Sequence, residues 1–208
     1  MKYVRIHNKV IAACISIVVW LLATSAAADS PTAQIKSTVD QVIELLTDPR
    51  LSGENKNHER HRLLRDTILP QFDFKEMSRR SLGPNWRRLT PKQQDEFVDV
   101  FTDLLGKAYL GRIEFYNKER FIYINETIDE PYAEVRSKIV TSKGEEFSIN
   151  YRLRQTGGMW KIYDVVVEDI SLVNNYRSQF DRILSKTSYD ELIRRMKEKL
   201  SDSGHAPA

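Results

Sequence analysis

Side chains that commonly carry out chemistry are few in this sequence and stand apart from one another. His58 and His61 lie about one turn apart on a predicted helix, so they could share a metal ion. No cysteine stands near them, and Glu59 does not complete the HExxH pattern of zinc enzymes. A solvent-exposed helix face is the simpler interpretation, and we expect neither a metal site nor a cofactor.

Sequence motifs of the common enzyme classes are missing as well. The chain contains no G-x-S-x-G motif, no glycine-rich phosphate loop and no pair of cysteine and histidine. Asp73, Asp164 and Asp169 could each act as a general base, but a lone carboxylate is more often a helix cap or a surface charge. We therefore expect a protein that is not an enzyme.

A basic cluster is the third feature with chemical potential. Arg79, Arg80, Arg87 and Arg88 flank Trp86. Such a cluster could bind phosphate head groups or an acidic partner protein. The alternative, which we favour from sequence, is a solvated face beneath which Trp86 packs inward.

The first residues have the layout of a secretory signal peptide. Lys2, Arg5 and Lys9 precede an almost unbroken apolar stretch over 10–23, and Ala26-Ala27-Ala28 offers a cleavage site. An uncleaved membrane anchor is the alternative, but the apolar stretch is short for a transmembrane span. We therefore expect residues 1–28 to be removed on export.

Loss of this segment changes the charge balance of the chain. The whole sequence has 32 Lys and Arg against 29 Asp and Glu, and the segment holds three of the basic residues and none of the acidic ones. The remaining chain therefore has 29 of each, whereas a nucleic-acid-binding protein is expected to keep a basic excess. The composition argues against a nucleic-acid partner.

The exported chain depends on its core, because its only cysteine, Cys14, lies in the predicted signal peptide and leaves no disulfide. Its length is sufficient for one domain with a sizeable core, which we place at 29–200. The remaining segment, 201–208, is polar and is predicted to be a disordered tail.

The spacing of apolar residues divides this domain into a helical half and a half made of strands. Helical spacing covers 35–46, 54–68 and 72–82, and Thr90-Pro91-Lys92-Gln93 is a strong start for a fourth helix. Alternating or apolar runs then predict four strands, at about 121–127, 133–139, 147–153 and 159–167. Two further helices are predicted to begin at Ile170 and after Ser188.

This order predicts an α+β fold, in which a curved four-stranded antiparallel meander packs against N-terminal and C-terminal helices. A curved sheet that faces helices encloses a space lined by large apolar side chains. Val165, Val166 and Val167 put apolar groups on both faces of the last strand, so both faces must be covered. Strand alternation and the helical stripe predict the lining Phe97, Phe101, Leu105, Tyr109, Val135, Ile139, Phe147, Ile149, Tyr151, Leu153, Ile162 and Val166.

Two segments of the sequence resemble signatures of one known family. The first, FDFKEMSRRSLGPNWRRLTPKQQDEFVDVFTDLLGKAYLGRI, contains F-D-F, then L-G-x-x-W-R and T-P-x-Q, then a helix of F-x-x-x-F form. The second is WKIYDVVVEDISLVNNYRSQF. Together they resemble the MlaC family, the periplasmic phospholipid-binding component of the Mla ABC transport system. The chain departs from many relatives at Asp169, where they have glycine.

This resemblance implies a periplasmic carrier, and we expect it to be a monomer. Such a carrier moves a phospholipid between an outer-membrane lipoprotein complex and an inner-membrane ABC transporter complex, which maintains outer-membrane lipid asymmetry. The resemblance also implies that acyl chains enter a deep apolar cavity while the head group stays near solvent. A periplasmic enzyme and a protein-binding adaptor with a solid core are the alternatives.

Overall fold

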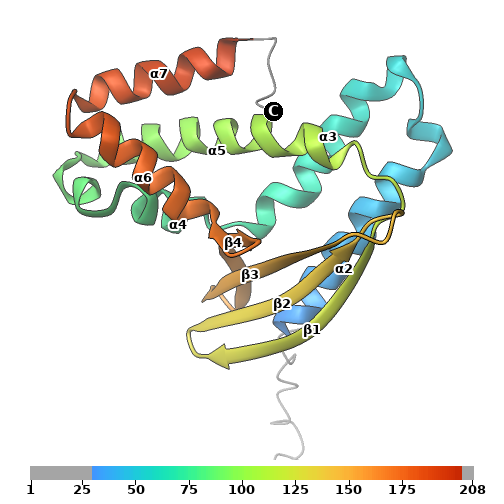
Figure 1. Ribbon diagram of the computed structural model, residues 1–208. Helices are drawn as coiled ribbons and strands as arrows, with labels where there is room; N and C mark the ends of the chain where they lie inside the picture. Colours follow the sequence, from blue (N-terminus) through green and yellow to red (C-terminus); the bar gives the residue numbers. More distant parts are fainter. Residues whose placement is uncertain (1–29, 203–208) are drawn as a thin grey trace, which may run out of the picture.

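A computed structural model describes residues 30–202 of the chain (Figure 1). The predicted signal peptide, 1–28, and all but the first two residues of the predicted tail lie outside the described residues. Within the range 30–202, no helix combines the length and apolar character that crossing a bilayer requires.

Within the described residues, four α-helices precede the sheet, and a side chain caps the N-terminus of three of them. They are α2 (Pro31–Thr47), α3 (Asn57–Ile68), α4 (Phe74–Leu82) and α5 (Pro91–Ile113). Short 3₁₀ segments connect them, at Pro49–Leu51, Glu54–Lys56, Leu69–Gln71 and Gly83–Arg88. The predicted capping box at Thr90 and Gln93 is confirmed, with both reciprocal hydrogen bonds present at the start of α5.

The second half forms one antiparallel sheet in which the strands follow their order in the sequence. The strands are β1 (Arg120–Asp129), β2 (Tyr132–Val140), β3 (Glu146–Thr156), β4 (Met159–Val167) and β5 (Ile170–Ser171). The α+β class is confirmed. The expected count of four strands is wrong, because the short strand β5 adds a fifth.

The fifth strand forms because the chain reverses tightly after Val167. Glu168 and Asp169 both have positive φ angles, 46° and 61°, as the two central residues of a type I′ hairpin turn do. This turn pairs Ile170 with Val167, and the helix that was predicted from Ile170 begins only after it. Aspartate tolerates the left-handed region better than most residues, so Asp169 can occupy the second central position of this turn without being glycine.

Two helices, α6 (Leu172–Leu184) and α7 (Tyr189–Ser201), follow the sheet in the described part of the chain. In Figure 1, α4, α5, α6 and α7 gather at one end of the sheet, while α2 runs alongside the strands. The core is accordingly in two parts. One lies among the helices around Phe97, Phe101 and Phe180, and the other lies between α2 and the sheet around Ile35, Val135 and Leu153.

Candidate functional site

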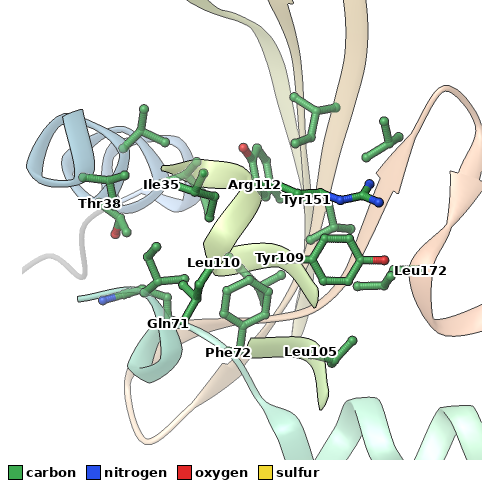
Figure 2. A pocket seen from close by; sticks show the side chains of 18 of the residues that line it. Ile35, Thr38, Gln71, Phe72, Leu105, Tyr109, Leu110, Arg112, Tyr151 and Leu172 are labelled. Atoms are coloured by element: carbon green, nitrogen blue, oxygen red, sulfur yellow. The ribbon is translucent and has the colours of Figure 1, made fainter. Parts of the chain in front are cut away.

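An apolar cavity of about 720 Å³ lies between the helices and one face of the sheet (Figure 2). The apolar stripe of α2, the segment from Ile68 to Met77 and the second half of α5 form its helical walls. The opposite wall is made by strand residues, namely Phe121, Ile139, Ile149, Tyr151, Ile162, Val165 and Val167. Its volume falls within the roughly 300–1,000 Å³ that is usual for ligand pockets.

The cavity has a buried end and an open mouth. Ile35, Met77 and Ile162 line it and are almost fully buried. Phe115 and Ile170 also line it, yet they are 84% and 64% exposed. A side chain that both lines a cavity and is exposed must lie where the cavity meets solvent, so these two residues mark the mouth.

The F-D-F motif, Phe72 to Phe74, lines the cavity with its two rings and stabilises the fold through its aspartate. The rings of Phe72 and Phe74 stack with centroids 5.6 Å apart, and both line the cavity. Asp73 between them caps α4 by accepting a 2.9 Å hydrogen bond from the Glu76 amide, and its carboxylate also pairs with Arg154 on β3. The Asp73 amide donates to the carbonyl of Ile162, so this residue joins α4 to the sheet.

Half of the lining residues predicted from sequence lie at this cavity. Two come from the second half of α5 and four from the sheet, and they are Leu105, Tyr109, Ile139, Ile149, Tyr151 and Ile162. The strand positions follow the expected alternation, because Ile149 and Tyr151 are two residues apart on β3 and share a face.

The remaining predicted residues lie elsewhere in the described chain. Phe97 and Phe101 belong to the helical core, where the ring centroid of each lies 5.5 Å from that of Phe180 on α6. The first half of α5 is thus covered by other helices, which its apolar periodicity alone does not reveal. Val135 and Leu153 are fully buried in the core beside α2, and Phe147 is 42% exposed near the β2–β3 turn.

Val166 lies on the face of β4 opposite the cavity, because the strand contains an irregularity. Arg152 pairs with Asp164, whereas the next residue, Leu153, pairs with Ile162, so Tyr163 is an extra residue in β4. The bulge inverts the alternation beyond it. Val165 and Val167 therefore line the cavity, and Val166 is buried on the other side.

Several lining residues were not predicted from sequence. The apolar stripe of α2, which includes Ile35, Val39 and Val42, was recognised as a helical pattern but not as part of a cavity wall. The spacing that identified the helix was the only available signal. Arg112 in the last turn of α5 and Phe115 just after the helix gave no signal at all, because only the tertiary structure places them at the mouth.

Polar groups around the mouth include one cation. Among the described residues that line the cavity, Arg112 alone is positively charged. Burial raises the pKa of Tyr109, and the charge of Arg112 and a hydrogen bond with Tyr176 oppose the change. Figure 2 shows the guanidinium of Arg112 and the phenol of Tyr109 pointing in the same direction, toward Leu172.

Asp73, Asp164 and Asp169, which the sequence offered as lone general bases, do not line the cavity. Asp73 caps α4, and Asp164 accepts hydrogen bonds from Ser171 and the Val173 amide. Asp169 is exposed in the β4–β5 turn. His58 and His61 are exposed on α3, and no group of three or more metal-ligating side chains occurs within residues 30–202.

Known proteins share both the sequence signatures and this fold. A family model described as MlaC protein matches residues 36–198. The chain is 23% identical over 144 residues to the intermembrane phospholipid transport system binding protein MlaC of Haemophilus influenzae, with 67% of each chain covered. It is 27% identical over 105 residues to toluene tolerance protein ttg2D of Pseudomonas putida, which is 50% of this chain and 49% of that one.

A solved structure shares the fold of this chain. The phospholipid-binding protein of Ralstonia solanacearum, determined in complex with a phospholipid, superposes with a TM-score of 0.72 and 28% identity. The superposition covers 81% of this chain and 96% of that one. The family model spans most of the described residues, and the family predicted from the two signatures is confirmed: the chain belongs to the MlaC family.

Proposed function

We propose that this protein is a periplasmic phospholipid carrier whose cavity holds the acyl chains. The observation that carries the proposal is the apolar cavity of about 720 Å³, which is closed at one end and open at the other. The phospholipid-bound relative of the same fold supports it. Of the residues predicted from sequence, Leu105, Tyr109, Ile139, Ile149, Tyr151 and Ile162 are proposed to contact the lipid, together with Phe72 and Val165.

Transfer of lipid from water would be too favourable for a working carrier. A diacyl lipid has about 30 methylenes, and burying them is worth on the order of 24 kcal/mol at about 0.8 kcal/mol each. This exceeds the roughly 20 kcal/mol at which non-covalent affinities saturate. The protein must therefore exchange lipid with sites that are already apolar. The free energy of the lipid in the cavity then needs only to be close to its free energy in a bilayer or in another apolar site.

The lipid is proposed to enter with its head group at the mouth. Arg112 supplies a positive charge there, and the Tyr109 and Tyr176 phenols lie close enough to that charge for it to affect their pKa values. The phosphate of a phospholipid carries a negative charge that a guanidinium recognises well. The acyl chains would then point toward Ile35 and Ile162 at the buried end.

The proposed route runs between an outer-membrane lipoprotein complex and an inner-membrane ABC transporter complex, which would maintain lipid asymmetry of the outer membrane. The family and the intermembrane transport role named for the Haemophilus relative support this route. Carriage is favoured over catalysis because the lining is mainly apolar, and its two carboxylates, Glu119 and Glu168, accept hydrogen bonds from the backbone amides of Asn117 and Ser148. An adaptor with a solid core is disfavoured by the cavity itself.

Mass spectrometry of lipids that co-purify with the protein from its native host tests the proposal. We expect phospholipid in an amount near one molecule per chain, and the delipidated protein should take it up again from vesicles. Protein that is folded, carries no lipid and extracts none from vesicles would contradict the proposed function.

A further inference from the structure

A second pocket, of about 780 Å³, brings together arginines from four separate segments. We call it the arginine pocket, and its cationic residues are Arg79 and Arg80 of α4, Arg87 and Arg88 of the following 3₁₀ segment, Arg152 of β3, and Arg177 of α6. The sequence suggested a cluster of only four. The fold adds Arg152 and Arg177, which are far away along the chain.

Internal contacts hold several of these guanidinium groups in place. Glu76, almost fully buried, pairs with Arg79 at 2.6 Å and with Arg80 at 2.7 Å. The Arg80 guanidinium also lies 4.1 Å from the centroid of the Tyr163 ring, within the range of a cation–π contact.

A glycine allows the close approach of Arg177. Gly83 has a φ of 54°, and a Cβ atom added there would lie 3.0 Å from the Arg177 Nε atom. A larger residue at this position would be strained and would displace Arg177. Contacts within the protein thus hold Arg79, Arg80 and Arg177 around the pocket, so these arginines supply a positive field without having to be ordered on binding.

The pocket keeps an excess of positive charge. Among the described residues that line the pocket, Asp164 alone is acidic, and its carboxylate already accepts hydrogen bonds from Arg152, Ser171 and the Val173 amide. Arg87 and Arg88 are exposed, and neither side chain has a hydrogen bond or ion pair with any residue in the described range. These two arginines can therefore bind an external anion without breaking an internal contact.

The shape and the floor of the pocket restrict the kind of anion. Pro84, Trp86 and Val173 line it beside the arginines, and Trp86 packs inward as the sequence suggested. A pocket of this volume is far larger than one phosphate group needs, and it offers apolar contact as well as charge. An occupant with several anionic groups and apolar side chains would use both.

The arginine pocket lies next to the apolar cavity, on the other side of β4 and α6. Leu172 and Asn175 line the cavity, whereas Val173, Asn174 and Arg177 of the same helix line the arginine pocket. A protein bound in the pocket would thus stand beside the cavity. If the protein is a carrier, as proposed above, the complexes that exchange lipid with it must dock beside the cavity. The location of the arginine pocket therefore favours a protein partner over a free anion.

We propose that the arginine pocket binds an acidic segment of a partner protein, through carboxylates on Arg87 and Arg88 and apolar contact with the floor around Trp86. The test uses the purified, lipid-loaded protein and a short fluorescein-labelled peptide composed of glutamate and leucine. Fluorescence anisotropy should show saturable binding that weakens as sodium chloride is added. The double variant Arg87→Gln/Arg88→Gln should bind at least about tenfold more weakly.

The matched control is Lys143→Gln/Lys186→Gln. It removes the same charge from two exposed lysines that lie outside both pockets and have no side-chain hydrogen bond or ion pair in the described range. The control should bind the peptide within about twofold of the unchanged protein. Equal weakening in both double variants, or no binding of the peptide at all, would overturn the proposal.

A flotation assay decides between a protein partner and a membrane. If vesicles of phosphatidylglycerol retain the protein through Arg87 and Arg88 while the peptide does not bind, the occupant is a lipid surface and the proposal is wrong. The lipid content of Arg87→Gln/Arg88→Gln should match that of the unchanged protein. Failure of peptide binding in a protein that still carries lipid would therefore leave the proposed carrier function intact.

Discussion

The Asp164 carboxylate accepts a 3.0 Å hydrogen bond from the backbone amide of Val173, and this contact ties β4 to the start of α6. Its other oxygen accepts from the Ser171 hydroxyl at 2.7 Å and from Arg152 of β3 at 3.3 Å. One buried side chain thus connects two strands and a helix between the apolar cavity and the arginine pocket.

Removal of this carboxylate should destabilise the protein. Asp164→Ala leaves the Val173 amide without its acceptor and Arg152 without its buried partner, which should lower the free energy of unfolding by about 1–3 kcal/mol. Asp164→Asn keeps one carbonyl oxygen for the Val173 amide, so its loss should be smaller. Urea denaturation measures both, and a change within about 0.5 kcal/mol for Asp164→Ala would contradict the structural role.

Acid should weaken the fold through Glu76. Burial alone would raise the pKa of this carboxyl, but hydrogen bonds from Arg79 and Arg80 outweigh burial and lower the pKa to about 2, from 4.5. Because the folded protein then binds the proton less readily than the unfolded chain, the contribution is complete above pH 4.5 and disappears as the pH falls toward 2. The expected loss is on the order of 2 kcal/mol, after allowance for the partly exposed arginines.

Glu76→Gln separates this effect from the other carboxylates. The variant should be less stable than the unchanged protein at pH 7, and the difference should shrink between pH 4.5 and 2. Glu191→Gln is the surface comparison. Hydrogen bonds from Arg194 and Arg195 lower the pKa of Glu191 to about 2 as well, but these arginines are exposed, so the loss of stability at pH 7 should be smaller than for Glu76→Gln. A constant stability difference across this pH range would show that Glu76 is not the titrating group.

Arg112 should contribute to phospholipid retention through the phosphate group. Arg112→Gln should lower the affinity for a phospholipid about fivefold, since an exposed charge pair is worth up to about 1 kcal/mol. Uptake of diacylglycerol with the same acyl chains should be unchanged, because that lipid has no phosphate. Uptake from vesicles that contain both lipids measures the ratio of the affinity for phospholipid to the affinity for diacylglycerol.

Arg120→Gln is the control for this experiment, because Arg120 is exposed at the start of β1 and does not line the cavity. It should keep the preference of the unchanged protein for phospholipid over diacylglycerol. An unaltered preference in Arg112→Gln as well would place the phosphate away from Arg112.

Local sequence signals predicted most elements but not the way in which they enclose the cavity. Alternation on β3 placed Ile149 and Tyr151 on one face, and the Thr90 capping signals placed the start of α5, because both depend on neighbours in the chain. The bulge at Tyr163 depends on pairing with β3, so alternation carried through it assigned Val166 to the wrong face of β4.

The helical half shows the same limit. The apolar stripe of α5 faces the helical core at Phe101 and the cavity at Tyr109, because α6 and α7 cover only part of the helix. Periodicity identifies an apolar face but not what packs against it. The arginine pocket was foreseeable only in part, since Arg152 and Arg177 reach Arg87 through tertiary structure.

The final prediction separates a cavity residue from a core residue. Ile149 lines the cavity and is half-buried, whereas Phe101 is fully buried and in contact with Phe180. Ile149→Trp should place its larger ring in space that acyl chains would occupy, so lipid bound per chain should fall while the melting temperature of the delipidated protein changes little. Phe101→Ala should do the reverse, with a stability loss of about 3–5 kcal/mol and normal lipid content in the folded fraction.

Both variants are compared after delipidation and exposure to the same vesicles, so that bound lipid does not itself raise the melting temperature. Lipid per folded chain is then measured by mass spectrometry. In a close-packed core, a tryptophan at Ile149 would be overpacked and would cost about 1–3 kcal/mol. If Ile149→Trp melts far lower yet carries normal lipid, Ile149 belongs to the core, and the lipid must lie elsewhere in the cavity.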